Sequence, residues 1–376
     1  MLSATLFTLL NLTAQVPVIQ PTRLRTVLPS RAIVFAERVP GARNITAQLW
    51  ISSDPAPETY QTHGWRHLLE HLMARNDGST DRALESGGGY LRAETYRTAT
   101  VFTVVAPKDS LTLALDSLKN VSRFPEVTQE RIAIEAKVLT QESRFRTPAD
   151  RMSATLWEKA YQEGGLDPFG NLDTIGGATV EDLRALYRRL FVMPGMVVSV
   201  SGDIDLDMAT KAAEAALTGR QPEPGEAKPP KGNARPIPYK GPGAARAVAV
   251  GSFRAPETVA VLAAALAVAN DIPGAFVTYT PSDEKGLVTV GHAEEAAALE
   301  AIDRMEPDNL FGRGRTLARR WLAAKMKDPA ARGLLLVQAR DLRPEIGDEN
   351  LTTMSTARFA GALARFKKGK ALETAQ

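Results

Sequence analysis

The chain has 376 residues, 44% hydrophobic and 24% charged, which is typical of a globular protein with one large domain or two. The net charge is only +3 and no long Lys/Arg run is present, so nucleic acid is not expected as a partner. The chain has no cysteine, which excludes disulfides, thiolate metal ligands and a cysteine nucleophile. Any bound metal must therefore be held by His, Asp or Glu.

The first residues, 1–16, resemble a secretory signal peptide. An apolar run from Leu2 to Leu12 precedes the small residue Ala14, which offers a cleavage point. The run is too short to span a bilayer, so no stable membrane span is expected. The pattern predicts export to the periplasm or the extracellular space. A buried first strand or an unimportant tail is the alternative.

The elements of the first half follow from hydrophobic periodicity and from turn residues. We expect strands at Arg31–Glu37 and Asn44–Ser52, helices at Gly64–Arg75 and Asp81–Ser86, strands at Tyr90–Tyr96 and Thr100–Ala106, and a helix at Lys108–Phe124. Further helices are expected at Gln129–Arg146, from Pro148 to Tyr161 and, with a capping box, at Thr179–Leu190. The strand Met196–Val200 and the helix Asp207–Leu217 complete this half.

The composition changes over 218–243, which is rich in Pro, Gly, Lys and Arg and reads as an exposed linker. After it we expect strands at Ala247–Phe253 and Gly286–Gly291, a helix at Thr258–Asn270 and helices over most of 296–368, without a last strand. The order of elements repeats that of the first half, which predicts a duplicated α+β unit. The expected domains are 17–217 and a shortened second domain, 244–376.

Histidine is the first sign of a site. The chain has four histidines, and three of them, His63, His67 and His71, lie within nine residues. The segment from His67 to His71 reads H-x-x-E-H, with Glu70 between the two histidines. On a helix, positions i and i+4 share a face, so these two imidazoles can bind one zinc ion. The alternative is a surface helix with two solvated histidines.

A catalytic zinc ion needs a third protein ligand and an open position for water. A carboxylate is the obvious choice, because no other histidine of the first half is well placed. The segment ERIAIEAKVLTQESRFR carries Glu135 and Glu142 about two helical turns apart, so both face the same way.

At this point the sequence resembles the insulinase or pitrilysin family of zinc metallopeptidases (inverzincins), which includes the mitochondrial processing peptidases. The resemblance is carried by GWRHLLEHLM, SGGGYLRAETYRTATVFTVVAP, ERIAIEAKVLTQE and DPFGNLDTIGGATVEDLRALYRRLFVMPGMVVSVSGDID. It implies two related α+β domains that enclose a chamber. It also implies zinc ligands at His67, His71 and Glu142, with Glu135 positioning one of the histidines.

The residue types suggest a mechanism. Zinc lowers the pKa of a bound water toward about 7, and Glu70 accepts a proton from that water and delivers it to the leaving amine. Glu135 orients His71 or His67, or is merely a solvated helix residue. Peptide substrates of the family bind as an added edge strand.

The sequence departs from the family in two places. The usual Asn-Ala pair of the substrate-binding strand is Arg92-Ala93 here. Arg92 either shifts the substrate preference toward acidic residues or projects into solvent. In the second domain, Ser282 and Thr289 align where active members carry an Arg and a Tyr that hold the substrate and its oxyanion. This domain therefore looks degenerate, unless the alignment is wrong and Arg313 or Arg315 fills the role.

Three hypotheses remain open on the sequence. The first is an active, exported zinc endopeptidase that hydrolyses peptides or unfolded protein segments. The second is a weakly active or non-catalytic helper subunit that forms a homo- or hetero-oligomer with another insulinase-like chain. The third is a metal-binding structural protein without hydrolase activity.

Overall fold

The structure is a computed structural model that describes residues 22–75, 78–217, 236, 238–328, 331–333, 335, 337 and 346–374. The expected signal peptide, 1–16, and most of the expected linker, 218–243, lie outside the described residues. Among the described helices, none is long and apolar enough to cross a membrane.

The first half is built on a sheet of six strands. Their order is β1 (Thr22–Val27), β2 (Ile33–Arg38), β6 (Met196–Gly202), β3 (Asn44–Ser52), β5 (Ala99–Pro107) and β4 (Tyr90–Thr95). The pairs are antiparallel except β2 with β6, which is parallel. The sequence did not predict β1. Strand β4 lies at one edge of the sheet, which matters for the site below.

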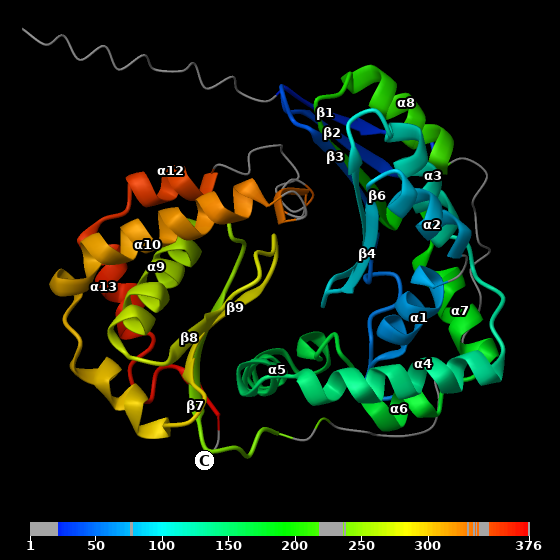
Figure 1. The fold of residues 1–376 in the computed structure, drawn as a ribbon. Coiled ribbons are helices and arrows are strands. Elements are labelled where there is room, and N and C mark those ends of the chain that lie inside the picture. Colours follow the sequence, from blue (N-terminus) through cyan, green and yellow to red (C-terminus); the bar gives the residue numbers. More distant parts are fainter. Residues whose placement is uncertain are drawn as a thin grey trace, which may run out of the picture.

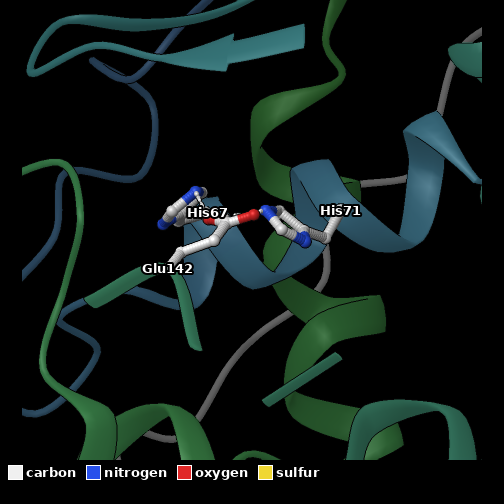
Figure 2. A group of neighbouring side chains, drawn as sticks. All are labelled: His67, His71 and Glu142. Carbon is white, nitrogen blue, oxygen red and sulfur yellow. Dashed lines mark ion pairs between the residues drawn. The ribbon is translucent and has the colours of Figure 1, made fainter. Parts of the chain in front are cut away.

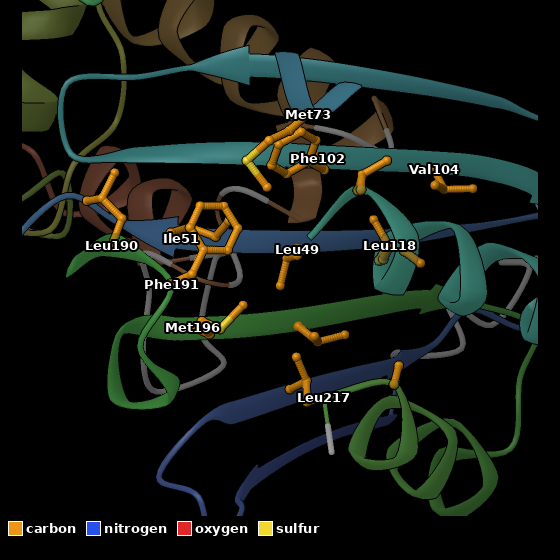
Figure 3. Packing of buried hydrophobic residues seen from close by; sticks show 14 of the residues in the cluster. Leu49, Ile51, Met73, Phe102, Val104, Leu118, Leu190, Phe191, Met196 and Leu217 are labelled. Carbon is orange, nitrogen blue, oxygen red and sulfur yellow. The ribbon is translucent and has the colours of Figure 1, made fainter. Parts of the chain in front are cut away.

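Helices cover one face of this sheet, and the core lies between them (Figure 1, Figure 3). The helices are α1 (Trp65–Ala74), α2 (Gly78–Ser86), α3 (Leu111–Val121), α4 (Gln129–Glu142), α6 (Leu172–Gly176), α7 (Val180–Leu190) and α8 (Leu206–Leu217), with short 3-10 turns at Ser143–Phe145, Gln162–Gly165 and Met193–Gly195. Alternation along β3 explains the layer, because Leu49 and Ile51 enter this core while Trp50 points to the opposite face. The capping box predicted at Thr179 is confirmed.

The second half is built on a smaller antiparallel sheet. Its order is β10 (Leu372–Glu373), β7 (Ala244–Val250), β9 (Gly286–His292) and β8 (Ala275–Thr278). Its helices are α9 (Pro256–Asp271), α10 (Pro307–Lys327), α12 (Ile346–Thr352) and α13 (Thr356–Ala364), with a 3-10 stretch at Ala296–Arg304. The buried residues of α9 form a second core with β7 and β9.

Two expectations for this half were wrong. A last strand, β10, does pair with β7, and its two residues are too few to show an alternating pattern. Strand β7 begins at Ala244 and ends at Val250, three residues earlier than expected. Phe253, the expected last strand residue, instead packs in a small separate cluster with Leu335.

Each half packs residues against the inner face of the other half's sheet. Helix α5 (Pro148–Tyr161) belongs to the first half but lies beside the second sheet (Figure 1). Its residues Met152, Leu156 and Trp157 pack on β7 and β9. In return, Val337 of the second half packs with Trp50 on the inner face of the first sheet. Each sheet therefore has part of its inner face covered by the other half.

A buried ion pair also joins the two halves. The Glu37 side chain on β2 is fully buried, and Arg332 of the second half donates to both of its carboxylate oxygens at 2.6 and 2.9 Å. Arg23 on β1 donates to the same carboxylate at 2.8 Å. Burial alone would raise the pKa of Glu37, but Arg332 and Arg23 outweigh it and hold this pKa below its ordinary value.

We expect Arg332→Ala to lower the free energy of unfolding at pH 7 by about 3 kcal/mol, because it leaves a buried carboxylate with one partner fewer. A carboxyl with a lowered pKa stabilises the fold above its unfolded pKa, about 4.3, and loses this contribution as the pH falls through the folded value. The difference between wild type and variant should therefore shrink in acid. Urea unfolding at neutral and acidic pH measures it. Arg319→Ala, which breaks an exposed pair with Asp348, should cost less than about 1 kcal/mol. An equal loss in the free energy of unfolding in the two variants would contradict a stabilising role for the buried pair of Glu37 and Arg332.

Candidate metal centre

Helix α1 carries the H-x-x-E-H segment with one face in the core. Leu68, Leu69 and Leu72 are at most 2% exposed and anchor the helix against the sheet. His67, Glu70 and His71 lie on the opposite side, as the i, i+3 and i+4 spacing predicts. The alternative, a surface helix with two solvated histidines, is wrong, because Glu70 and His71 are buried and His67 is only 14% exposed.

Glu142, the last residue of α4, meets the two histidines (Figure 2). Its Oε2 lies 3.9 Å from Nε2 of His67 and 3.6 Å from Nε2 of His71. One possible ligand atom from each of the three residues lies within 4.8 Å of the others. The three predicted ligands thus come together from two helices that are separated in sequence.

Both imidazoles are held in place at Nδ1, while Nε2 is the nitrogen that lies near Glu142. Nδ1 of His67 lies 2.9 Å from the carbonyl oxygen of Phe169, and Nδ1 of His71 lies 3.2 Å from Oε2 of Glu135. A carbonyl and a carboxylate can only accept, so each Nδ1 carries the hydrogen and each Nε2 presents its lone pair to the cluster. Burial also lowers the pKa of His67, which favours the neutral form that binds metals.

This donor set fits a zinc ion. Two ligands at 2.0–2.1 Å from a tetrahedral ion lie about 3.3–3.4 Å apart. The separations of 3.6 and 3.9 Å between Glu142 Oε2 and the two Nε2 atoms need only a small closure to reach that value. Three protein ligands would leave a fourth position open, as catalytic zinc sites do.

Glu70 stands beside this cluster without joining it. Its Oε2 lies 3.9 Å from Nε2 of His67 and accepts a hydrogen bond of 3.2 Å from the Thr95 hydroxyl. Burial raises the pKa of Glu70 to about 8, and the Glu142 charge adds to this effect. A divalent cation at the cluster would favour the ionised form, which is the form that can accept a proton.

The loop at 167–171 contributes to the site in a way that the sequence reasoning missed. The Phe169 carbonyl orients His67, and the Phe169 ring lies edge-on to that imidazole at 5.3 Å. Gly64 and Gly170 make this close approach possible: both have positive φ, and a Cβ on Gly170 would lie 2.2 Å from the Gly64 Cα. A main-chain carbonyl has no side-chain signature, so only the glycines hinted at it.

In the second half, the contacts of Thr289, Arg313 and Arg315 do not provide the Arg and the Tyr that the family resemblance implies. Thr289 on β9 is fully buried, and its hydroxyl has no hydrogen-bond partner in the described part of the chain. Arg313 pairs with Asp271, and Arg315 lies over the Phe311 ring at 5.5 Å, so each of these arginines contacts a residue of the second half. Ser282 lines a pocket between the halves.

Arg92 lies on the edge strand β4 with its side chain 56% exposed. Its Nη2 donates to Oε1 of Glu94 at 2.5 Å. The geometry therefore fits a solvent-facing arginine whose charge is partly balanced by its neighbour, while its effect on substrates stays a prediction.

Comparison with solved structures gives the class of fold. A protease from Helicobacter pylori has a TM-score of 0.74 at 15% identity, over 94% of this chain and 98% of that one. The periplasmic protease PqqL from Escherichia coli has a TM-score of 0.64 at 15% identity, over 93% of this chain and 47% of that one. The predicted fold class, two α+β units of the insulinase type, is confirmed.

The family follows from the sequence comparisons. Residues 33–167 match the family described as Insulinase (Peptidase family M16). This segment is therefore an insulinase (M16) domain, and the predicted resemblance is confirmed.

Curated relatives support the same assignment. An uncharacterized zinc protease of Streptomyces coelicolor is 24% identical over 51% of this chain and 44% of its own length. The probable mitochondrial-processing peptidase subunit beta of Arabidopsis thaliana is 25% identical over 53% of this chain and 39% of its own length. The matches thus cover about half of this chain and less than half of each relative.

Proposed function

We propose that the chain is a zinc-dependent endopeptidase that hydrolyses peptides or unfolded protein segments. The observation that carries this proposal is the convergence of His67 Nε2, His71 Nε2 and a Glu142 oxygen, with the Glu70 carboxyl beside them. Relatives named zinc proteases support the same activity.

The residues divide the chemistry among them. His67, His71 and Glu142 would hold a zinc ion, which would supply Lewis-acid chemistry to a water molecule and to the scissile carbonyl. Glu70 accepts the proton of the attacking water and then delivers it to the leaving amine. Glu135 positions His71 through the 3.2 Å contact with Nδ1, and so fixes the tautomer that leaves Nε2 free for the metal.

The free edge of β4 provides a place for the substrate. In the described part of the chain, β4 pairs only with β5, so its other edge has unpaired main-chain groups. An extended peptide can add to this edge as a further strand. Thr95, the last residue of β4, bonds to Glu70, so a peptide on this edge passes close to the proposed base.

Hydrolysis of an unstructured peptide with and without a chelator tests this function. We expect cleavage by the full chain, loss of cleavage after treatment with a chelator, and recovery when zinc is returned. Cleavage that persists in the metal-free protein would remove zinc from the mechanism. A zinc-loaded protein that cleaves no unstructured peptide would favour the helper-subunit or structural hypothesis.

The alternative function is a helper subunit that pairs with another insulinase-like chain. Ser282 and the buried Thr289 favour it, because neither can replace an Arg and a Tyr at a substrate. One relative is itself named as a subunit, of mitochondrial-processing peptidase. Light scattering, with activity titrated against a co-expressed homologue, separates the two: a monomer with full, concentration-independent activity excludes the pairing.

The domain division and the location belong to the same proposal. The two sheets fall on either side of 218–243, which fits domains at 17–217 and 244–376. Export to the periplasm or beyond rests on the apolar segment within 1–16, and a neighbour in fold is a periplasmic protease.

A further inference from the structure

A small pocket lies between the halves, next to the end of the edge strand β4. It is lined by Tyr96 and Arg97 of the β4–β5 hairpin, by Trp157 of α5, and by Pro281, Ser282 and Lys285 of the second half. Its volume is about 50 Å³, and it shares Thr98 and Ser282 with a larger cleft of about 440 Å³. A group of a few heavy atoms fits this space, since a cavity volume of about 10–15 Å³ holds one water molecule.

Two cations that line this pocket each lie over an aromatic ring of α5. The Arg97 guanidinium lies 4.2 Å above the Trp157 ring, and the Lys285 ammonium lies 5.3 Å from the Tyr161 ring. The two rings belong to successive turns of α5, with their centroids 5.2 Å apart. The aromatic faces thus hold both positive charges in place.

Neither cation has a carboxylate partner within 4.0 Å among the described residues. The neighbouring arginines do: Arg66 pairs with Glu58 at 3.5 Å, and Arg146 pairs with Asp167. In the described part of the chain, the Arg97 side chain makes one hydrogen bond, a long one of 3.5 Å to the Gly165 carbonyl. Burial lowers the pKa of Arg97 to about 10, which still leaves it charged at neutral pH. The Asp167 charge acts on Arg97 from a greater distance, but neither cation is neutralised by a direct ion pair, so an anion between them would be favoured.

We propose that this pocket binds a carboxylate of the peptide substrate, through Arg97 and Lys285. The inference rests on the proposed function, in which the peptide adds to β4. Thr95 at the end of β4 touches Glu70, and the next residue, Tyr96, lines the pocket, so a bound peptide reaches it just beyond the reacting bond.

The same pocket accounts for the missing arginine of the second half. Ser282 lines it together with Arg97, so the first half supplies a cation close to the position that the family's arginine would occupy. Arg97 offers a planar fork that can bind both oxygens of a carboxylate, and Lys285 adds a second charge. An acidic side chain and a C-terminal carboxylate share this chemistry.

Peptide binding to the full-length, zinc-loaded Glu70→Gln protein tests the proposal without turnover. The probe is a labelled, neutral, unstructured peptide in which one Glu is moved along the sequence, with the matched Gln peptides as controls and fluorescence anisotropy as readout. We expect one Glu position to bind about tenfold more tightly than its Gln counterpart. If amidation of the C-terminus removes the gain instead, the terminal carboxylate is the ligand.

Arg97→Gln and Lys285→Gln should each reduce this selectivity, measured as the ratio of the affinities for the Glu peptide and its Gln counterpart. Arg97→Lys keeps a positive charge and should retain part of it, which separates a charge effect from a folding defect. Arg188→Gln, an exposed arginine on α7, is the matched control and should retain all of it. Equal affinity of acidic, neutral and amidated peptides in the parent protein, or selectivity unchanged in both Gln variants, overturns the proposal. Cleavage of the neutral peptide by the Glu70-intact protein reports separately on the proposed function.

Discussion

Glu70→Gln should retain the metal and lose turnover. The carboxyl lies beside the cluster of His67, His71 and Glu142, 3.9 Å from His67 Nε2, and Thr95 already holds it through a hydrogen bond. A glutamine of the same size preserves the hydrogen bond but cannot accept a proton. Since general-base assistance contributes about 10²–10⁴ in rate, kcat should fall by that factor at unchanged zinc content.

Metal analysis and peptide hydrolysis on the same preparation make the comparison. Arg188→Gln on α7 again serves as the control and should match the parent in both measurements. A zinc-loaded Glu70→Gln protein with near-normal kcat would move the role of base to another residue. Loss of zinc in this variant would instead make Glu70 a ligand.

His71→Ala should abolish zinc binding under conditions in which the parent binds one ion per chain. His71 contributes one of the three converging ligand atoms, and two remaining ligands do not make a structural or catalytic zinc site. Glu142→Gln should weaken binding less, because the amide still offers an oxygen. Zinc content after dialysis, measured by mass spectrometry, gives both results.

His292→Ala is the matched control for this prediction. His292 lies on β9, where Nε2 faces the Pro273 carbonyl and Nδ1 accepts the main-chain hydrogens of Glu294 and Glu295. Its loss should lower stability and leave the zinc content unchanged. Parent-like zinc content in His71→Ala would contradict the proposed ligand set.

The parts of the site that are local in sequence could be predicted from it. The helix of His67 and His71, the position of Glu70 and the strand at Asn44–Ser52 depend on neighbouring residues, and the structure has them as expected. The placement of Glu142 opposite the histidines is a long-range fact. It came from the resemblance to a family and not from periodicity.

What escaped prediction has physical reasons. The Phe169 carbonyl acts through the main chain, which carries no residue signature. Strand β10 has two residues, too few for a pattern. The pairing of Glu37 with Arg332 joins residues 295 positions apart, and a chain with 46 Lys and Arg and 43 Asp and Glu offers too many pairs for charge alone to select one.

Because each half packs against the sheet of the other, the order of synthesis on the ribosome has a consequence for folding. When residues 22–217 have left the ribosome, the six strands of the first sheet are complete, but Glu37 still lacks Arg332, which lies 295 positions after it in the chain. Meanwhile Met152, Leu156 and Trp157 of α5 have no sheet to cover, since β7 and β9 do not yet exist. The first half therefore emerges with an apolar helix face and an unfilled sheet face exposed, a state that invites aggregation. Its nascent chain is where a chaperone would be needed most.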